Sequence, residues 1–144
     1  AEADISAMTD VGDATHVVRC GTVMTNLQAA LASTSTFTAD TMNSLLSKLE
    51  QIAITAESLH LDQHSLIANT NLLEVLRVQA AVRMVTASVQ SGMAREESRG
   101  SFQREDFPDT SDEFLYHITV DREGALGTLA IKKGAGGHWV LPPQ

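Results

Sequence analysis

Cysteine, proline and aromatic residues are scarce in this sequence. Its 144 residues include one cysteine, three prolines, one tryptophan, one tyrosine and four phenylalanines. The single cysteine, Cys20, excludes an internal disulfide and any zinc site built on cysteines, and we expect it to be a small packed side chain. With so few aromatic rings, the core depends on Ala, Leu, Val, Ile and Met, which suit helices better than a β-sandwich.

Positive charge and long apolar runs are also lacking. Ten Lys and Arg residues stand against 18 Asp and Glu residues, a formal net charge of −8. This charge repels phosphate backbones and anionic membranes, so we expect no nucleic-acid partner. The sequence has neither about 18 consecutive apolar residues nor a basic segment before an apolar run at its start. We therefore expect no signal peptide, no direct membrane insertion and a cytoplasmic location.

Two long helices are predicted in the middle of the chain. The hydrophobic fraction of 43% suits one soluble domain with a single core. Residues 66–97 predict the longest helix, because they contain no proline and no glycine before Gly92. Residues 40–60 predict a second helix, whose apolar residues recur at the spacing of bundle packing. Either Thr38 or Asp40 is expected to cap its amino end.

Shorter helical segments are expected upstream. The apolar residues at 23–31 predict a short helix after Gly21. A further turn or two is expected at 3–8, before a break at Gly12. These helices together predict a helical bundle over residues 1–100.

The helix expected at 66–97 has two apolar faces. The valine stripe consists of Val75, Val78, Val82, Val85 and Val89. The nearly opposite face consists of Leu73, Leu76, Ala80, Met84, Ala87, Ser91 and Ala94. Two apolar faces require two partners. One is the rest of this bundle, and the other is either a further helix of this chain or a surface that the chain does not contain.

After Gly100 the pattern changes to a charged loop and then to short strands. The loop at 103–113 contains a proline, and alternating apolar residues predict strands at 116–120 and 128–131. The segment 122–127 between them predicts a hairpin connection.

The end of the chain is rich in glycine. Residues 134–137 resemble a phosphate-binding loop only in their glycines, because no Lys-Ser/Thr pair and no helix follow them. We expect a flexible turn there and an extended piece at 138–141. Residues 101–144 are thus predicted to form a loop, a short β-hairpin and an extended tail that pack on the bundle as one domain.

No motif in the sequence forms a catalytic or metal site by itself. His60 and His64 are four residues apart and could share a metal, but no third ligand has a suitable spacing. Two solvated surface histidines explain the same pattern. No serine lies in a Gly-x-Ser-x-Gly setting. We therefore expect no catalytic, cofactor-binding or metal-binding residue in this chain.

A dense run of opposite charges follows the longest helix. Its forked guanidiniums belong to Arg95, Arg99 and Arg104, and its carboxylates include Glu97 and Asp106. One interpretation is a solvated helix end. The other is a latch, in which the arginines form bidentate pairs with these carboxylates or with those of a partner.

The helical pattern makes a specific prediction for the latch. Arg95 and Arg99 are expected one turn apart at the end of the helix, where its last carbonyls favour cations. Gly100 is expected to end the helix in a left-handed conformation. Glu97 then faces about 200° away from both arginines and reaches a different partner, either the following loop or another domain.

Several collinear motifs resemble one known family. They are Val18-Arg-Cys-Gly-Thr-Val-Met, Asn69-Thr-Asn-Leu-Leu-Glu, Arg95-Glu-Glu-Ser-Arg-Gly with Arg104, Asp106, Pro108 and Asp112, then His117-Ile-Thr and Leu141-Pro-Pro. The central run is similar to the Arg-x-Glu-Ser-Arg-Gly-Ala-His-x-Arg-x-Asp segment of succinate dehydrogenase and fumarate reductase flavoprotein subunits. Ser101-Phe102 replaces the Ala-His of that family. The chain thus resembles the carboxy-terminal region of these subunits.

The resemblance implies a mainly α fold, a three-helix, spectrin-like bundle with a short C-terminal β-hairpin and an extended tail. It also implies that FAD, the dicarboxylate and the catalytic groups belong to preceding domains. This chain alone is then expected to bind no FAD and to be inactive, whereas the parent is an oxidoreductase of electron transport. The alternatives are a free-standing helical interaction module and the equivalent domain of an L-aspartate oxidase.

The resemblance further implies a docking role for the charged latch. We define the latch as Arg95, Glu97, Ser98, Arg99, Gly100, Arg104 and Asp106. Its expected partner is the flavin-binding domain of the same parent chain, with an iron-sulfur subunit as a second candidate. The parent is expected to be cytoplasmic, with a peripheral position at the inner face of a membrane as one option.

Overall fold

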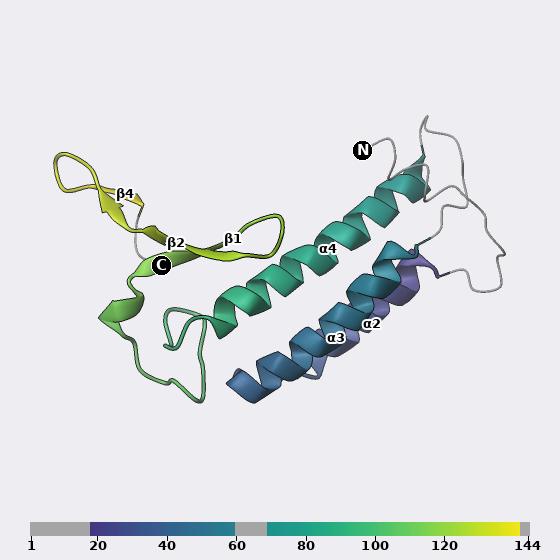
Figure 1. Ribbon diagram of the computed structural model, residues 1–144, viewed down its shortest axis with the longest axis horizontal. Coiled ribbons are helices and arrows are strands. Elements are labelled where there is room, and N and C mark those ends of the chain that lie inside the picture. The colour runs from purple at the N-terminus through teal and green to yellow at the C-terminus, as the bar shows by residue number, and fades with distance from the viewer. Residues whose placement is uncertain (1–17, 60–68, 142–144) are drawn as a thin grey trace. The chain divides into compact units, whose positions relative to one another are not determined.

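The computed structural model describes residues 18–59 and 69–141. In this part of the chain, helices α2 (Cys20–Ala32), α3 (Ala39–Glu57) and α4 (Thr70–Met93) precede a short 3-10 helix and two small antiparallel sheets (Figure 1). The predicted mainly α fold with a C-terminal hairpin is confirmed. The expectations for residues 3–8, Gly12, His60 and His64 lie outside the described residues.

The chain forms two compact units, and α3 and α4 each contribute to both. The first unit holds the described residues up to Ser33 together with Ser47–Thr86. The second holds Thr34–Leu46 and the described residues from Ala87 onwards.

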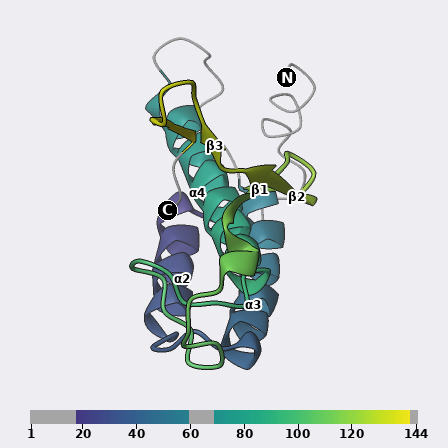
Figure 2. The ribbon, with the colours of Figure 1, turned by 90° about the vertical axis from the view of Figure 1, so that its left-hand side faces the viewer.

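The first unit has an aliphatic core. In it α2 and the adjoining parts of α3 and α4 run side by side (Figures 1 and 2). The buried residues are Val23, Leu27, Ala30, Leu49, Ile52, Ala56, Leu59, Val75, Val78 and Val82. The side-chain amide of Gln79 on α4 donates to the carbonyl of Ala56 on α3 at 3.0 Å. The absence of aromatic rings from this set agrees with the composition.

The two apolar faces of α4 have different environments. Val75, Val78 and Val82 are at most 2% exposed, so these three members of the valine stripe pack inside the bundle, as one of the predicted options, whereas Val85 and Val89 are half-buried. In contrast, Leu73 is 56% exposed and Leu76 is 47% exposed. The opposite face is thus left open to solvent along the part of α4 that belongs to the first unit.

Side-chain caps explain where α3 and α4 begin. The hydroxyl of Thr38 accepts a hydrogen bond from the backbone N–H of Thr41 at 3.2 Å, and the hydroxyl of Thr41 accepts one from the N–H of Thr38 at 2.9 Å. Thr38, one of the two predicted caps, is therefore confirmed. The carboxamide oxygen of Asn69 accepts from the N–H of Leu72 at 2.9 Å, so α4 begins at Thr70.

The prediction that the longest helix continues to residue 97 is wrong, because α4 ends at Met93. Arg104 donates hydrogen bonds to the carbonyl of Met93 at 3.0 Å and to the carbonyl of Arg95 at 2.8 Å. The guanidinium of Arg104, which is distant in sequence, thus replaces the backbone N–H donors that further helical turns would have supplied. The last carbonyls are satisfied without further turns.

The first hairpin pairs β1 (Tyr116–Val120) with β2 (Leu126–Ala130). β1 has the predicted bounds, but β2 begins two residues earlier than expected. The carboxylate of Asp121 accepts hydrogen bonds from the N–H groups of Glu123 and Ala125, at 3.0 and 2.7 Å. This tight turn allows pairing to start at once, with Leu126 opposite Val120.

A second, smaller hairpin was not predicted. β3 (Lys132–Lys133) pairs with β4 (Trp139–Leu141), within one residue of the extended piece expected at 138–141. The glycine-rich segment forms the turn between them, because Gly136 and Gly137 adopt positive φ values of 95° and 80°.

Candidate functional site

Glu97 is the centre of the charged segment that follows α4, and it is 0% exposed. Arg99 donates to both carboxylate oxygens, from Nε to Oε1 and from Nη2 to Oε2, each at 2.9 Å. Nη1 of Arg95 also donates to Oε1. The backbone N–H of Ser111 donates to Oε2 at 2.8 Å. Two cations and one amide therefore neutralise and satisfy a fully buried anion.

These contacts fix the charge states of the cluster. The pKa of Glu97 falls from its ordinary value of 4.5 to about 2, chiefly because Arg99 hydrogen-bonds to the carboxylate, although burial opposes the fall. The amide of Ser111 and the guanidinium of Arg95 lower this pKa further. The same pairing raises the pKa of Arg99. Neither Glu97 nor Arg99 is therefore suited to exchange a proton near neutral pH.

The same two arginines hold the segment that leads into β1. Arg95 donates from Nη1 to the carbonyl of Phe114 at 2.8 Å and from Nη2 to the carbonyl of Tyr116 at 2.6 Å. Arg99 donates from Nη2 to the carbonyl of Ser111 at 3.0 Å. The guanidinium carbon of Arg95 also lies 5.8 Å from the centre of the Tyr116 ring. The cluster thus joins the end of α4 to the start of the first hairpin.

Arg104 forms a second buried centre and is 3% exposed. Its Nη1 donates to the carbonyl of Arg95 at 2.8 Å and to that of Met93 at 3.0 Å, with that of Gly92 at 3.4 Å. The guanidinium carbon lies 4.6 Å from the centre of the Phe107 ring. A cation at the carbonyl end of a helix also interacts favourably with the helix dipole.

Asp106 completes this second centre and links it to α3. Arg104 donates from Nε to Oδ1 at 2.8 Å and from Nη2 to Oδ2 at 2.6 Å. Oδ2 also accepts from the backbone N–H of Ala39, the first residue of α3, at 2.8 Å. The pKa of Asp106 is accordingly lowered from 3.8 to about 2, first by the hydrogen bond from Arg104. The backbone N–H of Glu105 donates to the carbonyl of Phe37 at 3.0 Å.

Ser98 organises the loop between the two centres and is 3% exposed. Its hydroxyl accepts from the backbone N–H of Arg104 at 2.8 Å and donates to the carbonyl of Phe107 at 2.7 Å. Its own N–H donates to the carbonyl of Asp109 at 3.0 Å, and its carbonyl accepts from the hydroxyl of Thr110 at 2.7 Å. Ser98 is thus bound by backbone groups on both sides rather than presented as a nucleophile.

A tight turn places an aromatic ring against α4. Arg99 and Phe102 exchange backbone hydrogen bonds of 2.9 and 3.0 Å, and Gly100 between them has a φ of 58°. A β-carbon built on Gly92 would lie 3.1 Å from the ring of Phe102. The same ring is 5.7 Å from that of Phe37, centre to centre. Gly92 thus allows the ring to approach the helix backbone.

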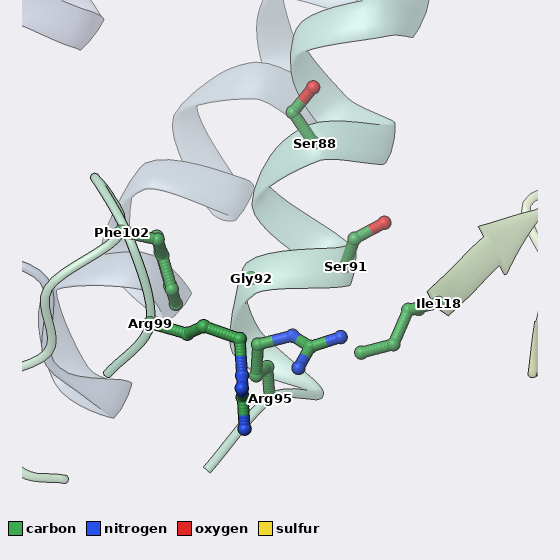
Figure 3. A pocket seen from close by; sticks show the side chains of 7 residues that line it. All are labelled: Ser88, Ser91, Gly92, Arg95, Arg99, Phe102 and Ile118. Atoms are coloured by element: carbon green, nitrogen blue, oxygen red, sulfur yellow. The ribbon is translucent and has the colours of Figure 1, made fainter. Parts of the chain in front are cut away.

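A hollow of about 230 Å³ lies beside this turn (Figure 3). It is lined by Ser88, Ser91, Gly92, Arg95, Arg99, Phe102 and Ile118. Figure 3 shows the guanidinium of Arg95 extending toward Ile118. The hydroxyl of Ser91 donates to the carbonyl of Ala87 at 2.8 Å. Because no histidine or carboxylate is among the lining residues, the hollow offers no nucleophile and base pair.

The structure brings the whole latch together within the second unit, where Arg99 pairs with Glu97 and Arg104 with Asp106, each in a bidentate geometry inside the chain. Two details of the prediction are wrong. Glu97 does not face away from Arg95 and Arg99 but binds both, because the segment is irregular instead of helical. Gly100 has the expected left-handed conformation, but it shapes the turn to Phe102 and does not end a helix.

The sequence reasoning missed the backbone donors of the cluster. The N–H groups of Ser111 and Ala39 bind Glu97 and Asp106, respectively. Every residue type except proline has such a group, so no sequence signal marks them. Within the described residues, no three or more His, Cys, Asp or Glu side chains are grouped to hold a metal. No helix in that part of the chain has the length and hydropathy of a membrane span.

Comparison with protein families gives a match over most of the chain. Residues 21–135 match the family model described as "Fumarate reductase flavoprotein C-term". A fumarate reductase flavoprotein subunit of Mycobacterium tuberculosis is 37% identical over 117 residues, which cover 78% of this chain and 20% of that subunit. A succinate dehydrogenase flavoprotein subunit of Rickettsia conorii is 34% identical over 73 residues, or 49% of this chain and 12% of that subunit.

Solved structures show the same fold. A FrdA chain of the E. coli quinol fumarate reductase superposes with a TM-score of 0.76 at 22% identity. The superposition covers 99% of this chain and 25% of the E. coli chain. The chain therefore spans about a fifth to a quarter of the length of the relatives that it matches over most of its own length.

Proposed function

The chain belongs to the family of fumarate reductase flavoprotein C-terminal domains, and from this premise we propose that it is the structural carboxy-terminal domain of an FAD-dependent flavoprotein that interconverts succinate and fumarate. FAD, the dicarboxylate and the catalytic groups then belong to other parts of the parent, and this chain alone binds no FAD and has no turnover. The ratio of its length to that of its relatives supports a role as one domain among several.

The saturation of the charged cluster is the observation that carries the structural role. Both oxygens of Glu97 and both of Asp106 accept hydrogen bonds from groups of this chain. The pKa of each carboxyl is lowered to about 2. A general acid or base requires a pKa near the working pH and a free path to the substrate. The cluster instead stabilises the segment between α4 and β1.

The partner that we propose is the flavin-binding domain of the same parent chain. The latch contributes to the structural role by holding the segment between α4 and β1 in one conformation. An iron-sulfur subunit is a second proposed contact, and the assembled parent is proposed to be cytoplasmic and peripheral to the inner face of a membrane.

Flavin and activity measurements test this proposal. We expect the purified 144-residue chain to remain colourless after incubation with FAD and gel filtration, and the full-length protein that contains it to carry FAD and to interconvert succinate and fumarate. Stoichiometric flavin on the chain alone would contradict the structural role. A full-length protein without a flavin-binding segment would favour a helical interaction module, and oxidation of L-aspartate would favour the aspartate oxidase alternative.

A further inference from the structure

We propose that the exposed face of α4, formed by Leu73, Leu76, Ala80 and Met84, is the surface on which the flavin-binding part of the same polypeptide docks. This inference rests on the proposed function and deepens it by naming the surface. It assigns the contact between domains to an apolar helix face and not to the charged latch, whose groups bind one another. Leu73, Leu76 and Met84 are 56%, 47% and 70% exposed.

The face is a continuous stripe rather than scattered apolar residues. Its members are three, four and four residues apart, which places them along one side of a helix. The opposite side of the same helix already carries the core, because Val75, Val78 and Val82 are at most 2% exposed. The exposed stripe is therefore not needed to fold the first unit, and covering it gains additional hydrophobic free energy.

The size of the face favours a covalently linked occupant. Residues 73–84 form a patch about 17 Å long and about 10 Å wide, or about 170 Å². Stable complexes between separate proteins bury about 800 Å² on each partner. A patch this small is a weak site for a free partner or for a second copy. A segment of the same polypeptide is held at a high effective concentration, so a smaller apolar contact suffices.

The net charge of the chain and the length of its relatives both favour a segment of the same polypeptide over a second copy. Arg77 and Arg83 are exposed. Residues seven apart on a helix point in nearly the same direction, so Arg77 lies beside Met84 at one edge of the face and Arg83 lies beside Leu76 at the other. Arg77 is paired with Glu74 at 2.8 Å, whereas Arg83 fits a partner surface that carries a carboxylate. A second copy of this chain carries a net charge of −8 and is repelled as a whole. The relatives meanwhile have about four-fifths of their length outside the matched region.

Site-specific photo-cross-linking tests the proposal in the full-length flavoprotein. A benzophenone amino acid replaces Leu76 on α4 in one sample and Ile54 on α3, which is 58% exposed in the same unit, in the control. We expect the probe at position 76 to cross-link in high yield to the flavin-binding segment of its own polypeptide. We expect the control probe to give at least fivefold less of that product. Cross-links from position 76 to a second copy, to another subunit or to nothing would overturn the proposal.

A matched pair of charge substitutions gives an independent readout. Leu76→Glu should lower the melting temperature of the full-length protein by several degrees and leave that of the 144-residue chain unchanged, whereas Ile54→Glu should change neither. An equal loss in both proteins for Leu76→Glu would mean that the residue stabilises only its own bundle, and would overturn the docking surface. A flavin-loaded protein that fails these tests refutes this inference alone, while the absence of a flavin-binding segment refutes the proposed function with it.

Discussion

Glu97 is completely buried. A buried carboxylate requires that its charge be neutralised and that its oxygens accept hydrogen bonds. Arg99 meets the first need with a bidentate pair, and the N–H of Ser111 helps to meet the second. An ion pair of this kind gives little net stability relative to an apolar core, but removing one partner leaves a costly buried charge. The cluster therefore specifies one conformation of the segment more than it adds to total stability.

The first prediction concerns pH. The pKa of Glu97 is about 2 in the folded chain against an ordinary value of 4.5. Because the folded-state pKa is the lower one, ionised Glu97 contributes stability above pH 4.5, and this contribution is lost as the pH falls toward 2. Glu97→Gln should be less stable than the wild type near neutral pH and should lose less stability over this acid range. Urea unfolding at a series of pH values measures both effects.

Asp106 sets the background for that experiment. Its pKa is also lowered to about 2, so the Glu97→Gln variant should keep part of the acid dependence. Glu74→Gln is the control, because Glu74 forms an exposed pair with Arg77 and such pairs contribute little. Identical acid slopes for the wild type and Glu97→Gln would contradict the prediction.

The second prediction concerns the buried Arg104. Its guanidinium holds Asp106 and the carbonyls of Met93 and Arg95. Arg104→Ala removes the buried donor of the Met93 and Arg95 carbonyls, while Oδ2 of the exposed Asp106 keeps the N–H of Ala39. The change should cost about 3 kcal/mol in the free energy of unfolding. The matched surface change Arg77→Ala should cost at most about 1 kcal/mol. Equal losses for the two variants in denaturant titrations would show that the Arg104 centre is not a structural hub.

At the scale of elements, the end of α4 shows what the sequence could and could not predict. Periodicity identified the helix and its valine face, because both depend on local spacing. It could not show that the helix ends at Met93, because the groups that satisfy its last carbonyls come from Arg104, about ten residues farther on. The charged residues of the latch were identified from their types, but their pairing depends on this irregular segment.

The third prediction tests the contact between α4 and the turn that follows. Alanine is normally more stable than glycine inside a helix by about 1 kcal/mol. A β-carbon at Gly92, however, would lie 3.1 Å from the ring of Phe102. Gly92→Ala should therefore give no stabilisation in the wild-type chain but about 1 kcal/mol in a Phe102→Ala background. A double-mutant cycle of unfolding free energies measures the coupling, and additive effects would refute the contact.

At the scale of the whole molecule, the family match and the two faces of α4 give a consistent account. The buried face serves the first unit, as the burial of its valines shows. The charged cluster serves the second unit, because its members bind one another and nearby backbone groups. Leu73, Leu76 and Met84 on α4 are among the large apolar residues that stay exposed. The resemblance in sequence indicated the family, but only the burial pattern distinguishes the surface left open from the one already used.

The last prediction concerns Arg99 in the full-length flavoprotein. This arginine pairs with the buried Glu97 and with the carbonyl of Ser111, so its loss should loosen the segment between α4 and β1 rather than change a substrate contact. Arg99→Ala should therefore reduce assembly or flavin retention while the flavin-loaded fraction keeps its KM for dicarboxylate. Flavin content, gel filtration and steady-state kinetics on the purified variant measure these quantities, with Arg77→Ala as the surface control. A collapse of turnover at full flavin occupancy and normal assembly would mean that Arg99 reaches the active site, and the structural role proposed for the cluster would then be wrong.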